Sequence, residues 1–438
     1  MTSLLITNGT LVTLNDEGAI IHHGSVLIQD GVITAAGHLD GVSADRVIDA
    51  GGRIVMPGLI NAHHHLYSTL ARGFSPPGEP ATNFKEILER LWWKLDYALN
   101  ADDVYYSSML PMVEAIRAGC TTIIDHHASP SCCDGSLDIV ERAFREAGLS
   151  GCLCYEVSDR NKIGEGIEEN IRFIRKCQEA DDPQLAALFG LHASMTLGPE
   201  TLERCAAAGE ELGVGFHVHI DEAECDGEES LELFGARPVD RFVNAGIAGP
   251  GSLFAHGIHL DDRGWGMLAE TGTMMVTNPE SNMNNGLAVT PLLELLHAGI
   301  LIGLGTDGMS NSLIAQARAA YLIQRAVRLD PRVAFVEACR LLLTNNRLIA
   351  DRVFGEPRGR LVEGHLGDVI IMDYRPFTPF DESTFYGHLL FGLVNARVTT
   401  TIARGRVLME NGVITHLDEE AICRKATEAA RALWKRIA

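Results

Sequence analysis

The chain has 438 residues, of which 46% are hydrophobic and 21% are charged, as in a globular protein with a large buried core. Its formal net charge of −22 disfavours nucleic acids and anionic membranes as partners. Apolar runs stay shorter than the roughly 20 residues that cross a bilayer. We therefore expect neither a nucleic-acid partner nor a membrane association.

The two ends of the chain share a strand-rich pattern with Gly, Asp and Asn at the turns. In residues 1–57 the expected strands are 4–14, 24–29, 31–37 and 46–48. In residues 363–438 they are 367–373, 398–402 and 405–413, followed by a helical stretch at 419–437. These patterns predict one small β-sandwich domain formed by both termini.

Residues 58–362 alternate short apolar strands with helical patterns. Strands are expected near 55–63, 121–126, 151–157, 185–193, 214–220, 252–257, 273–278 and 300–306. Helices are expected at 101–118, 136–147, 165–179, 199–211 and 290–298. Eight β/α units over about 300 residues predict an α/β fold, a (β/α)8 TIM barrel, rather than an open doubly wound sheet.

The ten cysteines are scattered, and only residues 132–133 and 152–154 hold close pairs. In a chain of this length that distribution indicates reduced thiols in a cytosol rather than disulfides. No basic stretch followed by an apolar segment marks a signal peptide. We therefore expect a cytoplasmic location, with Cys152 and Cys154 packed in the interior.

The first barrel strand is expected to end in three consecutive histidines, residues 63–65. On a strand, His63 and His65 lie on the same face, so both imidazoles can bind one metal ion. An isolated His-x-His could instead be a solvated turn, and the rest of the chain decides between the two.

Polar residues occupy every expected strand end, where a barrel of this kind places its active site. In strand order they are His63 and His65; Asp125, His126 and His127; Tyr155 and Glu156; His192; His217, His219 and Glu222; His256; Asn278; and Asp307. This regularity is the strongest functional signal in the chain, and it favours a metal site over a solvated turn.

Three imidazoles and one carboxylate form a candidate ligand set for a divalent cation, with a position left for water. The predicted ligands are His63, His65, His219 and Asp307, and Zn²⁺ suits them best, with Fe²⁺ as the alternative. A cation there lowers the pKa of water towards about 7 and supplies hydroxide. The fourth strand lacks a lysine near its end, so we expect one metal rather than two.

Two further residues have expected catalytic roles. Glu222 lies three residues after His219, where it can move protons without binding metal. His256 can orient the attacking water or stabilise developing negative charge.

Four histidines have roles that the spacing leaves open. His64 points away from its neighbours and is expected to pack between strands and helices. His217 could replace His219 as ligand, although the spacing to Glu222 favours His219. His126 and His127 could contact substrate or close the barrel.

These motifs resemble the amidohydrolase superfamily over essentially the whole chain. Residues 57–65 resemble its first-strand motif, and residues 219–222 its fifth-strand His-x-x-Glu. Residues 255–260, 278–282 and 305–308 are similar to its sixth, seventh and eighth strands. The resemblance is to the mononuclear branch that deaminates guanine, 8-oxoguanine, cytosine, S-adenosylhomocysteine and triazines.

A narrower resemblance is to the SsnA-type aminohydrolases. Residues 83–93, 125–130 and 154–159 look like theirs, whereas Thr277 stands where many family members have histidine before Asn-Pro. The resemblance implies substrate contacts from His192, from Asn278 and from Trp92 or Trp93 on a lid helix. An indole there can stack on a flat heterocycle, although one of the two tryptophans could equally be a packing residue.

The leading hypothesis from this resemblance is hydrolytic deamination of a nitrogen heterocycle, a purine-type base, with release of ammonia. Hydroxide formed at the metal attacks the amine-bearing carbon, Glu222 protonates the ring nitrogen and then the amine, and His256 and Asp307 hold and deprotonate the water. The alternatives on the same fold are hydrolysis of a cyclic amide and of a halo- or alkylamino-heterocycle. A non-catalytic scaffold is disfavoured because all the expected ligands are present.

The expected partner is therefore a small heterocyclic substrate. We also expect a homo-oligomer. A dimer is assumed because homodimers are the commonest closed assembly.

Overall fold

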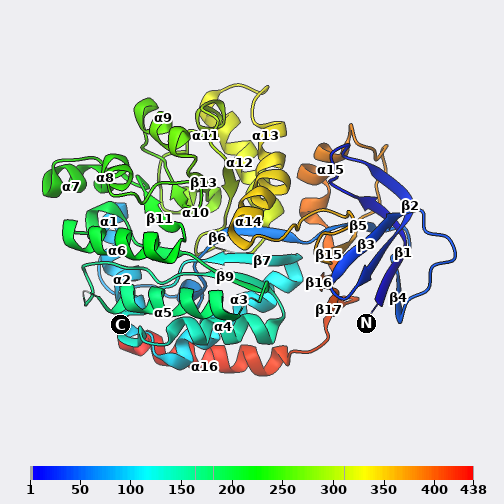
Figure 1. The fold of residues 1–438 in the computed structure, drawn as a ribbon, viewed down its shortest axis with the longest axis horizontal. Helices are drawn as coiled ribbons and strands as arrows, with labels where there is room; N and C mark the ends of the chain where they lie inside the picture. The colour runs from blue at the N-terminus through cyan, green and yellow to red at the C-terminus, as the bar shows by residue number, and fades with distance from the viewer. Residues whose placement is uncertain (1–2, 163, 181, 310, 438) are drawn as a thin grey trace.

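The computed structural model describes residues 3–162, 164–180, 182–309 and 311–437. Both ends of the chain meet in one nine-stranded mixed sheet at one end of the molecule, away from most of the helices (Figure 1). Its strands follow the order β18-β17-β16-β15-β5-β1-β2-β3, with β4 beside β1. They are β1 (Ser3–Val12), β2 (Ile20–Gln29), β3 (Val32–Gly37), β4 (Arg46–Asp49), β5 (Ile54–Pro57), β15 (Val369–Asp373), β16 (Arg397–Ala403), β17 (Arg406–Glu410) and β18 (Val413–Ile414).

The two termini are joined where β5 pairs antiparallel with β15, for example Val55 with Ile371. Both residues belong to a buried apolar cluster that also contains Ile6 and Ile402. The structure thus brings both predicted terminal segments into one sheet. The description as a sandwich and the domain limits at residues 57 and 362 stay predictions.

The middle of the chain forms two parallel sheets, β6-β7-β8-β9 and β10-β11-β12-β13-β14. Their strands are almost entirely buried, as expected for parallel sheets covered on both faces. They are β6 (Leu59–His64), β7 (Cys120–Asp125), β8 (Ser150–Leu153), β9 (Leu185–Ala187), β10 (Phe189–Leu191), β11 (Phe216–Ile220), β12 (Leu253–His256), β13 (Met274–Thr277) and β14 (Ile302–Leu304).

Backbone hydrogen bonds join the two parallel sheets at both edges. At one edge the amide of Thr306, just after β14, donates to the carbonyl of His63 at 2.9 Å. At the other edge the amide of His192 donates to the carbonyl of Val157 at 3.0 Å. The carboxyl ends of strands from both sheets therefore lie around one common centre.

Helices surround the parallel sheets, and several begin and end at recognisable caps. In α3 the side chain of Asn100 and that of Asp103 form a capping box, and Gly119 ends the helix with φ 77°. The helices are α1 (Phe84–Ile87), α2 (Trp93–Ala98), α3 (Ala101–Ala118), α4 (Ser136–Ala147), α5 (Glu165–Ala180), α6 (Pro199–Leu212), α7 (Glu224–Phe234), α8 (Pro238–Asn244), α9 (Asp262–Thr271), α10 (Pro279–Asn284), α11 (Leu292–His297), α12 (Leu313–Arg328), α13 (Phe335–Arg340), α14 (Asn346–Phe354), α15 (Phe385–Phe391) and α16 (Glu419–Ile437). None of these described helices is long and apolar enough to cross a bilayer.

The last helix, α16, runs from the terminal sheet back along the outside of the molecule (Figure 1). There Arg436 forms an ion pair with Asp103 of α3. Trp434 Nε1 donates to the carbonyl of Leu70 at 2.7 Å. These contacts attach the end of the chain to the segment that follows β6.

One buried side chain ties the first and last parallel strands together, and it generates a stability prediction. Asn346 Nδ2 donates to the carbonyls of Ile60 at 2.7 Å and Leu304 at 2.8 Å, and Oδ1 accepts from the amide of Leu304 at 2.6 Å. Because Asn346→Ala leaves these buried groups unpaired, it should lower the free energy of unfolding by about 3 kcal/mol in urea denaturation.

The matched control is Gln178→Ala, which removes one exposed hydrogen bond to the carbonyl of Leu212. It should change the free energy of unfolding by less than about 0.5 kcal/mol. Equal effects of the two substitutions would contradict the bridging role of Asn346.

Candidate active site

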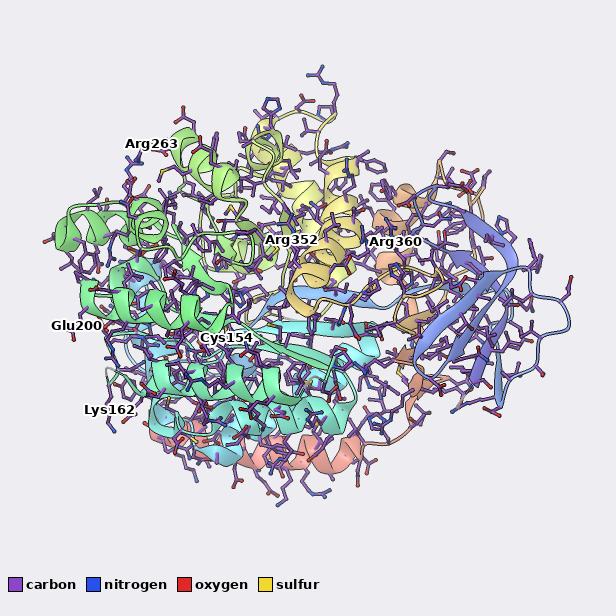
Figure 2. The ribbon with its side chains drawn as sticks, in the orientation of Figure 1. Cys154, Lys162, Glu200, Arg263, Arg352 and Arg360 are labelled. Carbon is purple, nitrogen blue, oxygen red and sulfur yellow. The ribbon has the colours of Figure 1, made fainter. Side chains whose placement is uncertain are left out.

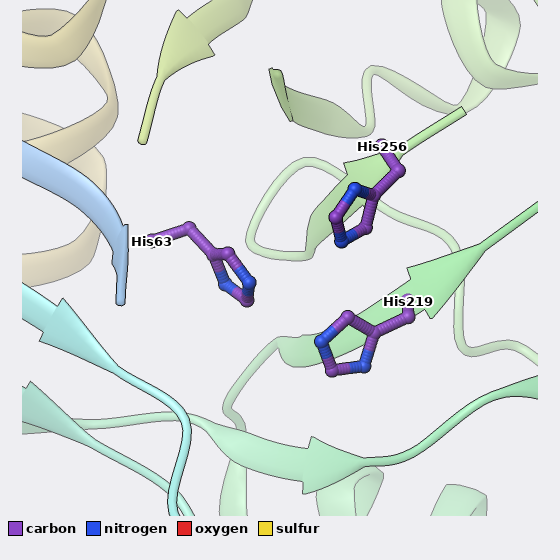
Figure 3. Close-up of side chains that lie close together, drawn as sticks. All are labelled: His63, His219 and His256. Atoms are coloured by element: carbon purple, nitrogen blue, oxygen red, sulfur yellow. The ribbon is translucent and has the colours of Figure 1, made fainter. Parts of the chain in front are cut away.

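The structure brings the four predicted metal ligands and His256 together at the carboxyl ends of the strands. Figure 3 shows the rings of His63, His219 and His256 converging from β6, β11 and β12. A nitrogen of each lies within 4.8 Å of those of the other two, and the same holds for the donor atoms of His63, His65 and Asp307.

Backbone carbonyls hold the imidazoles of His65 and His219 in a fixed orientation. His65 Nδ1 donates to the carbonyl of His126 at 2.7 Å, and His219 Nδ1 donates to the carbonyl of His192 at 2.8 Å. Their Nε2 atoms then face each other at 3.1 Å. Because each ring donates from Nδ1, both Nε2 atoms are directed at the same point.

The orientation of His63 depends on a chain of buried hydrogen bonds. Its Nδ1 lies 2.8 Å from Nε2 of His217, and His217 Nδ1 lies 3.7 Å from the sulfur of Cys154. The thiol in turn donates to the carbonyl of Asp125 at 3.5 Å. If each group donates to the next, His63 Nε2 keeps its lone pair, and that buried atom has no partner in the described structure. Cys154 is buried, and Figure 2 labels it near the middle of the view.

His256 and Asp307 are oriented by two residues of α10. His256 Nδ1 donates to Asn282 Oδ1 at 3.0 Å, and the buried Nε2 has no hydrogen-bond partner among the described residues. Ser281 Oγ donates to Asp307 Oδ2 at 2.7 Å. Both contacts fall within residues 278–282, although no role is expected for Ser281 or Asn282 from the sequence.

The donor set fits a divalent cation. Burial lowers the pKa values of His63 and His219 well below 6.5, so both imidazoles are neutral and can bind metal through Nε2. A carboxylate oxygen of Asp307 lies 3.3 Å from His65 Nε2. Each ligand also has an outer partner of the kind that orients metal-binding residues.

Glu222 lies between His256 and the open space of the site. One of its carboxylate oxygens is 3.5 Å from His256 Nε2, and its side chain is 13% exposed. Burial is the main cause that raises its pKa well above 4.5, and the charge of Asp307 adds to the effect. Glu222 can therefore carry a proton near neutral pH, as a general acid must.

Three residues at this centre have left-handed backbone conformations, which non-glycine residues adopt at a cost. They are Asp221 (φ 45°), His256 (φ 75°) and Asp307 (φ 52°). The turn at Asp221 is held by Asp226, which accepts a hydrogen bond from its amide at 2.9 Å. This geometry turns Glu222 towards His256 directly after the strand that carries His219.

A cavity of about 700 Å³ opens over the centre. His192 and both candidate tryptophans, Trp92 and Trp93, contribute to its wall. Of the two, Trp93 has its ring centroid 6.2 Å from that of His192. Asn278 is fully buried and is not among the lining residues, so the structure does not bring this predicted substrate contact to the cavity.

The lid predicted around the tryptophans consists of α1, a π-turn (Leu88–Trp92) and α2. Lys85 of α1 contacts Glu229 of α7 with 2.5 Å between Nζ and Oε1. The lid therefore bridges the cavity between distant parts of the chain.

His64, His126 and His127 make buried contacts that support the fold. His64 Nδ1 contacts Thr306 Oγ1 at 2.8 Å, and His127 Nε2 contacts Ser129 Oγ at 2.8 Å. Burial lowers the pKa of His64 to about 4 and that of His127 to about 3. His126 Nε2 donates to the carbonyls of Leu191 and His217, so it ties neighbouring strands together.

Known proteins resemble this chain along most or all of its length. The model of the amidohydrolase family matches residues 54–408. A 5'-deoxyadenosine deaminase from Methanosarcina mazei is 31% identical over 447 residues, covering 100% of both chains. A 5-methylthioadenosine/S-adenosylhomocysteine deaminase from Desulforudis audaxviator is 31% identical, covering 94% of this chain and 95% of its own.

The fold is also similar to that of a solved adenosine deaminase from Xanthomonas campestris with bound zinc. The TM-score is 0.86 at 21% identity, with 99% of this chain and 98% of that chain covered. At this identity the similarity concerns the fold alone.

The positions of His219 and His217 generate a prediction for metal content. His219→Ala removes a nitrogen that faces His65 and should abolish stoichiometric metal in elemental analysis. His217→Ala removes only the support of His63, so it should keep one metal per chain at about 10- to 100-fold lower affinity. The reverse result would make His217 the ligand.

Proposed function

The chain belongs to the amidohydrolase family, and we propose that it is a metal-dependent aminohydrolase that deaminates an aminopurine nucleoside. The observation that carries this proposal is the convergence of imidazole nitrogens, 3.1 Å apart between His65 and His219, beside the carboxyl of Glu222. Two relatives about 31% identical are named as deaminases of adenine nucleosides, which supports this substrate class.

We infer that the two parallel sheets form one closed eight-stranded barrel, with β9 and β10 as two halves of the fourth strand. The backbone hydrogen bonds at both sheet edges support the closure, as does the similarity in fold to the adenosine deaminase. In such a barrel the centre would lie at the carboxyl face, where catalytic groups are found.

His63, His65, His219 and Asp307 would hold the cation, and zinc fits three imidazoles and a carboxylate best. A divalent cation bound there supplies a Lewis acid that lowers the pKa of water. The zinc in the similarly folded adenosine deaminase supports this choice of metal.

Three side chains hold the water and transfer the protons. Asp307 and His256 hold the attacking water at the ring carbon that bears the amine, and Asp307 accepts its proton. Glu222 donates its proton to the adjacent ring nitrogen, and Asp307 passes the proton that it took from water to the amine. Glu222 regains a proton from the hydroxyl as the ring carbonyl forms and ammonia leaves. Water and the aminated ring thus become a ring carbonyl and ammonia.

The size of the cavity supports a nucleoside rather than a bare base. Its volume of about 700 Å³ lies within the roughly 300–1,000 Å³ of pockets that hold drug-sized ligands. Trp92 and Trp93 offer flat surfaces on which a purine ring can stack.

Ammonia release tests the proposal directly. The zinc-loaded protein should release one ammonia per 5'-deoxyadenosine or adenosine consumed. Removal of the metal by a chelator should abolish the activity, and added zinc should restore it. Metal-loaded protein that consumes no aminopurine nucleoside would contradict the proposed function.

The role of Glu222 has its own test. Because Glu222→Gln removes the proton carrier but no metal ligand, it should lower kcat by about 10²- to 10⁴-fold and keep the metal. Glu224→Gln, a change at an exposed neighbouring carboxylate, should leave kcat within about twofold of the original. Full activity of Glu222→Gln would exclude it as the proton carrier.

A further inference from the structure

A buried thiol, that of Cys154, lies behind the predicted metal ligands. Cys154 follows β8, is 1% exposed, and is not among the described residues that line the cavity. Its sulfur donates to the carbonyl of Asp125 at 3.5 Å and lies 3.7 Å from Nδ1 of His217. Nε2 of His217 lies 2.8 Å from Nδ1 of His63. A hydrogen-bond chain of four groups therefore runs from the carbonyl of Asp125 to one predicted ligand.

The direction of donation along this hydrogen-bond chain decides whether His63 can bind a metal. Burial lowers the pKa values of His63 and His217, so each neutral ring carries one proton. If His63 donates from Nδ1 to His217, its own Nε2 keeps a lone pair for the cation. If His217 were the donor, the proton of His63 would lie on Nε2, and that nitrogen could not bind a cation.

The carbonyl of Asp125 fixes this direction. Because a carbonyl oxygen can only accept, its hydrogen bond with Cys154 requires that the thiol donates. Burial raises the pKa of the thiol well above 9.0, so the group keeps the proton that it donates. Since a thiol has one proton, the sulfur can then only accept from Nδ1 of His217. Nε2 of His217 is left as an acceptor, and His63 donates to it.

The surroundings of the thiol offer no competing partner that would reverse this order. The ring nitrogens of His217 have no hydrogen-bond partners among the described residues other than Cys154 and His63. A Cβ on Gly190 would lie 3.0 Å from the sulfur, so the glycine leaves the space that Cys154 occupies. The thiol belongs to an apolar interior cluster that includes Ala62, Ile124, Leu253 and Ala255.

We propose that Cys154 is a positioning residue that sets the direction of this hydrogen-bond chain and thereby keeps Nε2 of His63 available to the cation. This inference rests on the proposed metal-dependent function, and it adds a residue that contacts neither the metal ligands nor the substrate cavity. Outer partners of this kind fix the tautomer of a metal-binding imidazole, and their loss lowers metal affinity by about 10- to 100-fold.

Zinc affinity, measured by competition with a coloured chelator, tests this role. Cys154→Ala removes both the donor and the acceptor, so His217 can adopt either tautomer and the affinity should fall about 10-fold or more. Cys154→Ser supplies a hydroxyl that donates and accepts, and it should bring the affinity to within about threefold of the original. Equal zinc affinities of the original protein and Cys154→Ala would overturn the inference.

The matched control is Cys152→Ala, two residues earlier on β8 and on the same face of the strand. Cys152 is also 1% exposed, belongs to the same apolar cluster, and forms no hydrogen bond with a described histidine. The substitution removes the same atoms from the core and should leave zinc affinity unchanged. If it weakened zinc binding as much as Cys154→Ala, packing would explain both effects and the inference would be wrong.

Nitrogen-15 NMR of the metal-free, histidine-labelled protein reads the direction of donation itself. The resonances of His217 are identified by their loss in His217→Ala. We expect a protonated Nδ1 and an unprotonated Nε2 for His217 in the original protein, and a mixture of tautomers in Cys154→Ala. A protonated Nε2 in the original protein, or an unchanged pattern in Cys154→Ala, would contradict the role of the thiol.

The two measurements also separate this inference from the proposed function. If the original protein bound no zinc while Nδ1 of His217 was protonated, the metal-dependent function would be wrong and the direction of the hydrogen-bond chain would stand. Stoichiometric zinc together with the opposite tautomer of His217 would overturn the role of Cys154 and leave the metal-dependent function intact.

Discussion

The Nε2 atoms of two imidazoles face each other at 3.1 Å while both Nδ1 atoms donate to backbone carbonyls, and the centre of this protein is built around that constraint. Because the Nδ1 protons of His65 and His219 are donated to backbone carbonyls, both Nε2 atoms are directed into the same small space. A cation bound there contacts both nitrogens at once. The surrounding strands, hydrogen bonds and buried cavity can be understood as the means of keeping these atoms in place.

Support for the centre comes from parts of the chain that are distant in sequence. Main-chain carbonyls at the ends of neighbouring strands orient His65 and His219, whereas side chains orient the others, through His217 for His63 and Asn282 for His256. The left-handed conformations of His256 and Asp307 show that the backbone is also fitted to this arrangement. Rigid support of this kind favours precise placement of substrate and water over tolerance to substitution.

Local patterns predicted most of the fold, because caps and apolar periodicity are properties of short segments. The helices α3, α4 and α16 begin and end at the expected residues, and the strand-end histidines were identified from spacing alone. Contacts between distant segments could not be predicted in this way. Examples are the pairing of Arg160 with Asp96, the support of His63 by His217, and the position of Asn278 behind the cavity wall. The choice between Trp92 and Trp93 likewise depends on how the lid packs.

The pairing of β5 with β15 has a consequence for biosynthesis. Strand β5 leads through Gly58 directly into β6, which carries His63, yet its partner β15 begins only at Val369. During synthesis, one edge of β5 therefore stays unpaired until most of the chain has been made. Such late pairing slows folding and leaves an apolar edge open to other chains. Production of this protein should accordingly depend on translation speed and on chaperones that protect nascent strands.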